Sequence, residues 1–110
     1  MNDHCFIEDS NGALHLFHIT GKAGGGPYDV GNEETFGHAV TRDLLNWQEW
    51  PNVLSIAPST TYEPHHLFAP FACMHDGRNY LFYAGINQER MNESMCLAVS
   101  DDLACWDKHP

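Results

Sequence analysis

Residues 36–47 read Phe-Gly-His-Ala-Val-Thr-Arg-Asp-Leu-Leu-Asn-Trp, and residues 95–106 read Met-Cys-Leu-Ala-Val-Ser-Asp-Asp-Leu-Ala-Cys-Trp. The two stretches share the core Ala-Val-(Thr/Ser)-x-Asp-Leu-x-x-Trp, and each is followed, after three further residues, by a proline. Each is also preceded by a shorter shared piece, at residues 11–18 and 76–83, that begins with Asn-Gly or Asp-Gly. Two copies of one pattern in the same order indicate an internal repeat, and the rest of the chain is interpreted within that frame.

Each repeat predicts four short strands. Apolar and aromatic residues are grouped in short runs separated by turn residues, and the Asn-Gly pair of the first repeat is a strong hairpin signal. The strands predicted in the first repeat cover residues 4–8, 14–19 and 36–41, with an outer strand beginning at Trp47. Those in the second cover residues 71–75, 79–85 and 95–100, with an outer strand beginning at Trp106. No segment has a convincing 3.6-residue apolar period, so we predict an all-β protein.

Four strands in about fifty to sixty residues are typical of one blade of a β-propeller. Propellers close with about four to eight blades, and two blades do not close. We therefore predict two four-stranded antiparallel blades of an incomplete propeller: residues 1–54, a linker at 55–68, and a second repeat at 69–110 that is cut short. Because the blade faces and sheet edges would be exposed, we expect a longer protein to supply the remaining blades and the isolated chain to fold poorly. The alternative is a free-standing β domain that dimerises or exchanges strands.

The charge of the chain excludes several classes of partner. Five Lys and Arg face fifteen Asp and Glu, for a net charge of −10, whereas nucleic acids and anionic membrane surfaces bind basic patches. No apolar run approaches the roughly 18 residues of a membrane span. The first residues are polar and acidic and show no signal peptide, so we expect a cytoplasmic location. The four cysteines (Cys5, Cys73, Cys96 and Cys105) form no Cys-x-x-Cys pair and are expected to be reduced and buried.

Other sequence features argue against a metal or a cofactor. The adjacent His65 and His66 would point to opposite faces of a strand, and no metal-ligand signature is present. The glycine-rich residues 21–32 are not followed by Lys-Ser/Thr or by a helix pattern, so they do not predict a phosphate-binding loop. No Gly-x-Ser-x-Gly motif supports a serine hydrolase. We expect no metal and no cofactor.

The repeat resembles a stretch found in a known family. Residues 36–47, with Pro51, resemble the Trp-Gly-His-Ala-x-Ser-x-Asp-Leu-x-x-Trp stretch of glycoside hydrolase family 32, the levanase, invertase and β-fructosidase group. Residues 2–4 stand where that family has Asn-Asp-Pro, and residues 14–18 where it has Tyr-His-Leu-Phe-Tyr. In the second repeat, residues 69–70 (Ala-Pro) and 77–83 resemble pieces of the related family 43. The resemblance implies a five-bladed propeller with the active site in its central funnel, of which this chain supplies the first two blades.

The resemblance also implies roles for particular residues. Asp3 matches the first-blade aspartate, which is the nucleophile in family 32 and the general base in family 43. Asn2, beside it, is expected to bind substrate. Phe36 and His38 lie two residues apart on one predicted strand, so both point to the same side and are candidates to line the sugar site, with core packing as the alternative for Phe36. The general acid is expected in later blades, and Glu63, in the linker, is not assigned to that role.

Several positions depart from the family pattern. His4 replaces the proline after the aspartate, and Ile19 stands where family 32 usually has a glutamine that contacts the sugar. Phe36 replaces the tryptophan before Gly-His, and Phe71 follows Ala-Pro where family 43 has its pKa-tuning aspartate. These changes leave the predicted fold intact and favour a distant subgroup over a standard invertase.

Three functions fit these observations. The first is a fragment of a glycoside hydrolase that cleaves glycosidic bonds in oligosaccharides or polysaccharides. The second is a non-catalytic carbohydrate-binding propeller, and the third is a propeller similar to the mannoside phosphorylases, which would require phosphate. All three imply a carbohydrate partner. The recurring Asp43 and Asp102, with Trp47 and Trp106, predict a structural device instead: a turn aspartate and a tryptophan that packs between blades.

Overall fold

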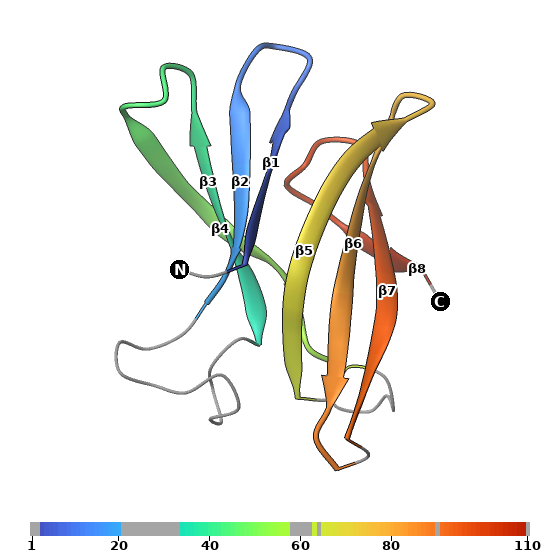
Figure 1. The fold of residues 1–110 in the computed structure, drawn as a ribbon. Coiled ribbons are helices and arrows are strands. Elements are labelled where there is room, and N and C mark those ends of the chain that lie inside the picture. Colours follow the sequence, from blue (N-terminus) through green and yellow to red (C-terminus); the bar gives the residue numbers. More distant parts are fainter. Residues whose placement is uncertain (1–2, 21–33, 58–62, 64, 90, 110) are drawn as a thin grey trace.

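The computed structural model describes residues 3–20, 34–57, 63, 65–89 and 91–109, which form eight strands in two antiparallel sheets (Figure 1). The sheet orders are β1-β2-β3-β4 and β5-β6-β7-β8, so each sheet is a simple meander. The predicted all-β fold of two four-stranded blades is confirmed. The strands are β1 (His4–Glu8), β2 (Leu14–Ile19), β3 (Thr35–Thr41), β4 (Trp47–Ser55), β5 (His66–His75), β6 (Arg78–Asn87), β7 (Asn92–Ser100) and β8 (Asp107–His109).

The first two strands have the predicted bounds. The linker predicted at residues 55–68 is shorter than expected, because strands extend into it from both sides. β4 continues through Pro51 to Ser55, and β5 begins at His66, inside the predicted linker. Proline is tolerated here because β4 pairs only with β3 and is an edge strand, and because the pairing register shifts around this point. The strands predicted at residues 79–85 and 95–100 are also too short, since β6 ends at Asn87 and β7 begins at Asn92.

The Asn-Gly hairpin turn is confirmed, and an aspartate organises it. The carboxylate of Asp9 accepts hydrogen bonds from the backbone N–H groups of Asn11 (2.8 Å) and Ala13 (3.0 Å). Gly12 has a φ of 84°, a left-handed conformation that glycine adopts without a side-chain penalty. This turn therefore follows from local chemistry alone.

The repeated Asp-Leu-x-x-Trp motif forms the same turn in both blades. Asp43 Oδ1 accepts hydrogen bonds from the backbone N–H groups of Leu45 (2.9 Å) and Asn46 (2.8 Å). Asp102 Oδ1 accepts bonds of 2.9 and 2.8 Å from the N–H groups at the same two offsets along the chain. These donors hold the pKa of each carboxyl group below its usual range, the backbone N–H groups being the main cause. The predicted turn aspartates are confirmed.

The leucine and the tryptophan of the motif complete this turn. Leu44 and Leu103 adopt left-handed φ angles of 68° and 67°, which is unusual for a residue with a bulky side chain. The indole N–H of Trp47 donates to the carbonyl of Leu44 (3.2 Å), and that of Trp106 donates to the carbonyl of Leu103 (2.9 Å). Each tryptophan thus closes its own turn, which explains why the spacing between the two residues recurs.

The hydrophobic core lies between the two sheets. Phe17 packs edge-on against Trp106 (5.6 Å between ring centroids), and Phe36 packs edge-on against Tyr83 (5.8 Å). The prediction that the repeat tryptophan packs between blades is therefore confirmed for Trp106. Trp47 instead stays 40% exposed and contacts Phe6. The buried residues of this core are Phe17, Phe36, Val53, Leu67, Ala72, Leu81, Tyr83, Cys96, Ala98 and Leu103.

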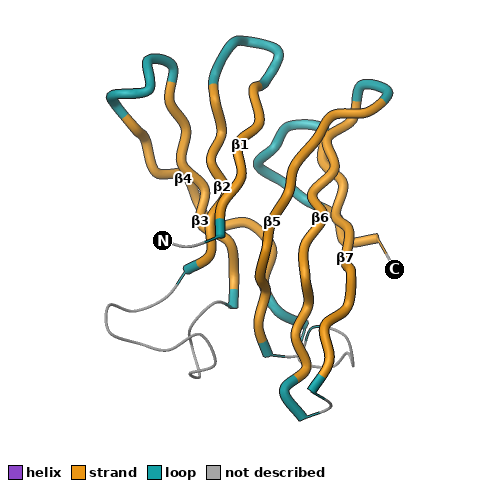
Figure 2. The backbone as a smooth tube through the Cα atoms, in the orientation of Figure 1, coloured by secondary structure: helices purple, strands orange, loops and turns teal. Residues whose placement is uncertain are grey.

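The opposite face of each sheet is open and carries large apolar side chains. Phe6 is 47% exposed, on the first sheet, and Phe71 and Met95 are 61% and 81% exposed, on the second. Figure 2 shows the two sheets side by side, with no further layer of described chain outside either of them. The four cysteines form no disulfide, and the expectation of burial is confirmed for Cys96. Cys5 and Cys73 are half-buried, and Cys105 is exposed because it lies in a surface turn.

Candidate active site

Asp3 lies directly before β1, at the end of the first sheet where β2 ends and β3 begins. Its backbone carbonyl accepts a hydrogen bond from the N–H of Ile19 (3.2 Å), and Ile19 in turn pairs with Phe36 at the start of β3. The side chain of Asp3 is exposed. The main chain that carries the predicted catalytic carboxylate is thus held by the neighbouring strand.

The carboxylate of Asp3 reaches the second blade. Its Oδ2 accepts a hydrogen bond from the backbone N–H of Ala69 in β5 (3.2 Å), a residue 66 positions along the chain. β1 and β5, the first strands of the two sheets, pack against each other (Figure 1). The junction of the two blades therefore places an acidic side chain where both sheets begin.

Phe36 and His38 do not line a surface that a sugar could contact. Phe36 is fully buried against Tyr83, and His38 is 2% exposed, beneath Trp50 and beside Phe17. Because both side chains point to the face that packs against the second blade, they belong to the core. The prediction that they bind substrate is corrected accordingly, and Asn2, the remaining candidate, lies outside the described residues.

His38 is the end of a buried hydrogen-bonded chain. His38 Nε2 lies 2.8 Å from His15 Nδ1, and His15 Nε2 lies 2.9 Å from Asp9 Oδ2. The remaining ring nitrogen of His38 is buried without a described hydrogen-bond partner. Burial, and secondarily the nearby His15 and His18, lower the pKa of His38 to about 4, so the ring is neutral at pH 7. These hydrogen bonds connect Asp9, in the first hairpin turn, to His38 in β3.

Glu63 is fully buried and serves the connection between the blades. Its carboxylate accepts a hydrogen bond from the hydroxyl of Tyr83 (2.7 Å) and contacts the ammonium group of Lys108. Lys108 also donates to the backbone carbonyl of Ser55, at the end of the first blade. A carboxyl group with no exposed surface cannot protonate a leaving group in a funnel, so the structure gives no reason to assign Glu63 as the general acid.

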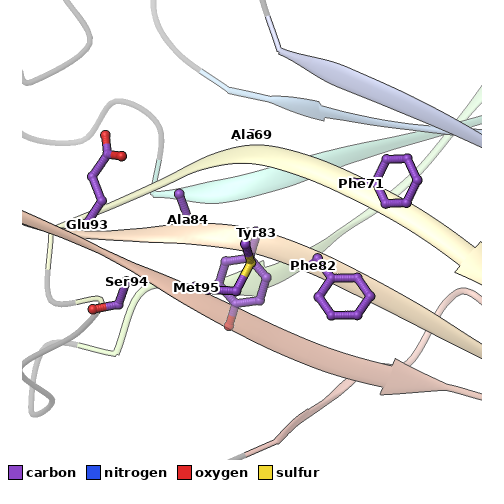
Figure 3. A pocket seen from close by; sticks show the side chains of 8 residues that line it. All are labelled: Ala69, Phe71, Phe82, Tyr83, Ala84, Glu93, Ser94 and Met95. Carbon is purple, nitrogen blue, oxygen red and sulfur yellow. The ribbon is translucent and has the colours of Figure 1, made fainter.

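An open hollow of about 460 Å³ lies on the second sheet, on the face turned away from the first. Figure 3 shows the rings of Phe71 and Phe82 at one end of it and Glu93 with Ser94 at the other. Ala69, the partner of Asp3, is part of its lining. The hollow is mainly apolar and has a single acidic lining residue in the described part of the chain, Glu93.

Two further properties concern only the described residues. Among them, no group of three or more His, Cys, Asp or Glu side chains is arranged to hold a metal ion. The same residues include no helix with the length and apolar character needed to cross a membrane.

Comparison with known proteins agrees with this geometry. Residues 1–110 match the profile of the N-terminal domain of glycosyl hydrolases family 32. The chain belongs to this family. A probable sucrose-6-phosphate hydrolase of Psychromonas ingrahamii is 32% identical over 81 residues, which cover 69% of this chain and 14% of that protein.

Solved structures give the same result for the fold of this family 32 chain. The family 32 β-fructofuranosidase of Bombyx mori is 27% identical with a TM-score of 0.69, and the match covers 99% of this chain and 22% of that enzyme. The fructan 1-exohydrolase IIa of Cichorium intybus is 23% identical with a TM-score of 0.72, covering 100% of this chain and 20% of that protein. The chain thus spans between about a seventh and about a fifth of the length of these relatives.

The sequence reasoning missed Ala69 as a partner of the family 32 aspartate. Ala69-Pro70 interrupts β5, and a proline inside a strand is a recognised sign of a bulge or an edge. That signal indicates an irregular backbone at this position. It does not indicate which distant group the irregular backbone contacts.

Proposed function

We propose that this chain supplies the catalytic carboxylate, Asp3, of a family 32 glycoside hydrolase. The observation that carries the proposal is the position of that carboxylate, exposed at the junction of β1 and β5 and held there by a backbone N–H group. An exposed aspartate at the start of a blade can meet a substrate in the funnel toward which all blades of a propeller converge. The resemblance of residues 2–4 to the Asn-Asp-Pro stretch of the family supports the same assignment.

The proposed reaction is the retaining hydrolysis of a glycosidic bond. An oxygen of Asp3 attacks the anomeric carbon, the bond from that carbon to the leaving oxygen breaks, and a carboxylic acid outside this chain gives the leaving oxygen its proton. Water then attacks the anomeric carbon of the sugar ester and gives a proton to the same group outside this chain, which is now a carboxylate. The bond from the anomeric carbon to Asp3 breaks. Free sugar leaves, and the carboxylate of Asp3 is restored.

The substrate class we propose is a fructoside within an oligosaccharide. The names of the relatives support it: a sucrose-6-phosphate hydrolase, a β-fructofuranosidase and a fructan exohydrolase. A variant of the Bombyx mori enzyme was also solved in complex with sucrose. Ile19 stands where the family usually has a glutamine that contacts the sugar, and its N–H bonds to the main chain of Asp3, so we expect the preferred fructoside to differ from that of standard invertases.

We further propose that the open sheet faces are covered by the remaining blades of the same protein. The exposed Phe6 and Trp47 on one side, and the exposed Phe71 and Met95 with the half-buried Phe82 on the other, have the composition of an interface between blades. Their positions on the two outer faces suit a ring in which each of these sheets has one more neighbour.

The test is the Asp3→Asn substitution in the full-length protein that contains these residues. We expect turnover of a fructoside to fall by about three orders of magnitude or more, because amide nitrogen and oxygen do not replace a nucleophilic carboxylate, while sugar binding measured by calorimetry persists. Asp76→Asn is the matched control, since Asp76 is an exposed turn aspartate of the second blade, and it should leave turnover unchanged. Turnover by Asp3→Asn equal to that of the wild type would exclude the proposal.

One observation favours a second candidate, a carbohydrate-binding propeller without catalysis. Phe71, 61% exposed, stands where the related family 43 has an acidic residue, and the hollow beside it is mainly apolar. This candidate predicts that the wild-type protein binds sugar without turnover. A fructoside hydrolysis assay of the wild-type protein distinguishes the two functions.

A further inference from the structure

The backbone of β5 is irregular at the point nearest to Asp3. The pairing of β5 with β6 passes from Phe68 opposite Ala84 directly to Phe71 opposite Phe82, so Ala69 and Pro70 together face the single residue Tyr83. This is the two-against-one pattern of a β-bulge, and such bulges redirect groups next to active sites. Ala69 also has a φ of 52°, a left-handed conformation that is sterically unfavourable for an alanine.

The bulge leaves one backbone donor for Asp3. Pro70 has no N–H group, so of the two bulge residues only Ala69 can donate, and its N–H points to Asp3 Oδ2 at 3.2 Å. A left-handed alanine persists only where surrounding structure requires it, and such strain is concentrated at functional sites. The proline, the bulge and the left-handed angle together direct one N–H group at one carboxylate oxygen.

We propose that the backbone N–H of Ala69 is a positioning group for Asp3, which makes the second blade part of the catalytic apparatus of the first. The inference rests on the proposed function of Asp3. The bond to Oδ2 restricts rotation of a carboxylate that is otherwise exposed and presents the other oxygen, Oδ1, to the anomeric carbon.

A second contact supports this role. The N–H of Ile19 bonds to the backbone carbonyl of Asp3, which holds its main chain from within the first blade, whereas Ala69 holds its side chain from the second. The two anchors come from different sheets. A change in how the blades meet would therefore move the carboxylate relative to its own strand.

The experiment removes the N–H group without changing a side chain. Lactic acid incorporated at position 69 of the full-length protein replaces the amide N–H by an ester oxygen and keeps the methyl group. We expect kcat to fall about ten- to a hundredfold, the effect of losing a hydrogen bond to a charged group, with KM unchanged. Lactic acid at position 84 is the matched control: Ala84 lies in β6, paired with Phe68 and Met95, and has no described contact with Asp3.

The Ala69→Gly variant tests the same inference by rescue. Glycine keeps the N–H group and accepts the left-handed angle, so kcat should stay within about twofold of the wild type. A loss of kcat at position 69 equal to that at position 84, or a change confined to KM, would overturn the positioning role. If Asp3→Asn is inactive while the ester variants at positions 69 and 84 have the same kcat, the catalytic role of Asp3 stands and the positioning role of Ala69 is wrong. If Asp3→Asn remains active, the proposed function itself fails.

If the ester at position 69 prevents folding, NMR spectroscopy of the unmodified protein tests the contact between Ala69 and Asp3. With ¹⁵N-alanine labelling, the amide proton of Ala69 should shift as pH is varied through the titration of the carboxylate to which it donates. That shift should disappear in Asp3→Asn, whereas the amide of Ala84 should behave identically in both proteins. An Ala69 amide that ignores pH in the wild-type protein would contradict the contact and the inference with it.

Discussion

At the scale of single residues, His38 carries the clearest pH dependence. Burial lowers the pKa of His38 from 6.5 to about 4, so between these values the unfolded chain binds a proton that the folded chain does not. Protonation of the unfolded state favours unfolding, and stability is therefore lost as pH falls from 6.5 to 4. We expect the free energy of unfolding to decrease by up to about 3 kcal/mol over this window.

Denaturant unfolding at a series of pH values checks this prediction. The His38→Gln variant is expected to be less stable at every pH, because glutamine does not reproduce the bond to His15, but its stability should change less between pH 6.5 and 4. His75→Gln is the control, since His75 is 75% exposed at the second hairpin. Equal pH slopes in the wild type and in His38→Gln would show that His38 titrates normally.

At the scale of elements, the repeated turn links stability to acid. The pKa values of Asp43 and Asp102 lie below the ordinary value of 3.8, mainly because backbone N–H groups donate to the charged form. A lowered pKa stabilises the folded state above 3.8, and this contribution is lost as pH falls from that value through the lower folded pKa. We expect Asp43→Asn and Asp102→Asn to flatten the loss of thermal stability below pH 3.8, a change that calorimetry measures.

The connection between the blades predicts a larger effect. Lys108→Met leaves the fully buried carboxylate of Glu63 with the Tyr83 hydroxyl but without its cation. Removing one partner of a buried ion pair costs about 3–5 kcal/mol. We therefore expect the free energy of unfolding, measured with denaturant, to fall by about that amount. The double variant Glu63→Gln/Lys108→Met should recover part of it, because no buried charge remains. Arg78→Met is the control, as its ion pair with Asp101 is exposed and should contribute less than about 1 kcal/mol.

At the scale of the whole molecule, the two open faces predict behaviour in solution. Residues 1–110 expressed alone expose Phe6 on one outer face and Phe71 and Met95 on the other. We expect this fragment to self-associate and to unfold without a sharp transition, since faces suited to other blades remain uncovered. Size-exclusion chromatography with light scattering measures the association. A monomer that unfolds cooperatively would contradict the prediction.

The tryptophan of the repeated motif has different surroundings in the two blades, and the sequence does not predict this difference. Trp47 and Trp106 occupy equivalent positions and bond to equivalent leucine carbonyls, so the local turn followed from the sequence. Trp106 packs on Phe17 between the sheets, whereas Trp47 lies on an open face. Which tryptophan is covered depends on which sheet has a neighbour on that side, and a local pattern carries no such information.

Strand ends were predicted less well than strand centres. β4 passes through Pro51, which local rules treat as a breaker, because an edge strand has no partner for the missing N–H.

Phe36 and His38 were predicted on the correct strand and with side chains on the same face, but that face turned out to be the interior. Alternation identifies the two faces of a strand, and only packing decides which of them meets solvent.

Sequence alone was sufficient for the repeat, the strand class, the Asn-Gly hairpin turn, the turn aspartates Asp43 and Asp102, and the resemblance to family 32. These features depend on residues a few positions apart, whose contacts follow from backbone geometry. Only the tertiary structure decided that His15 meets His38, that Glu63 meets Lys108, and that the N–H of Ala69 reaches Asp3. Such partners lie far apart in the chain, and they meet because strand register and the packing of one sheet on another bring them together.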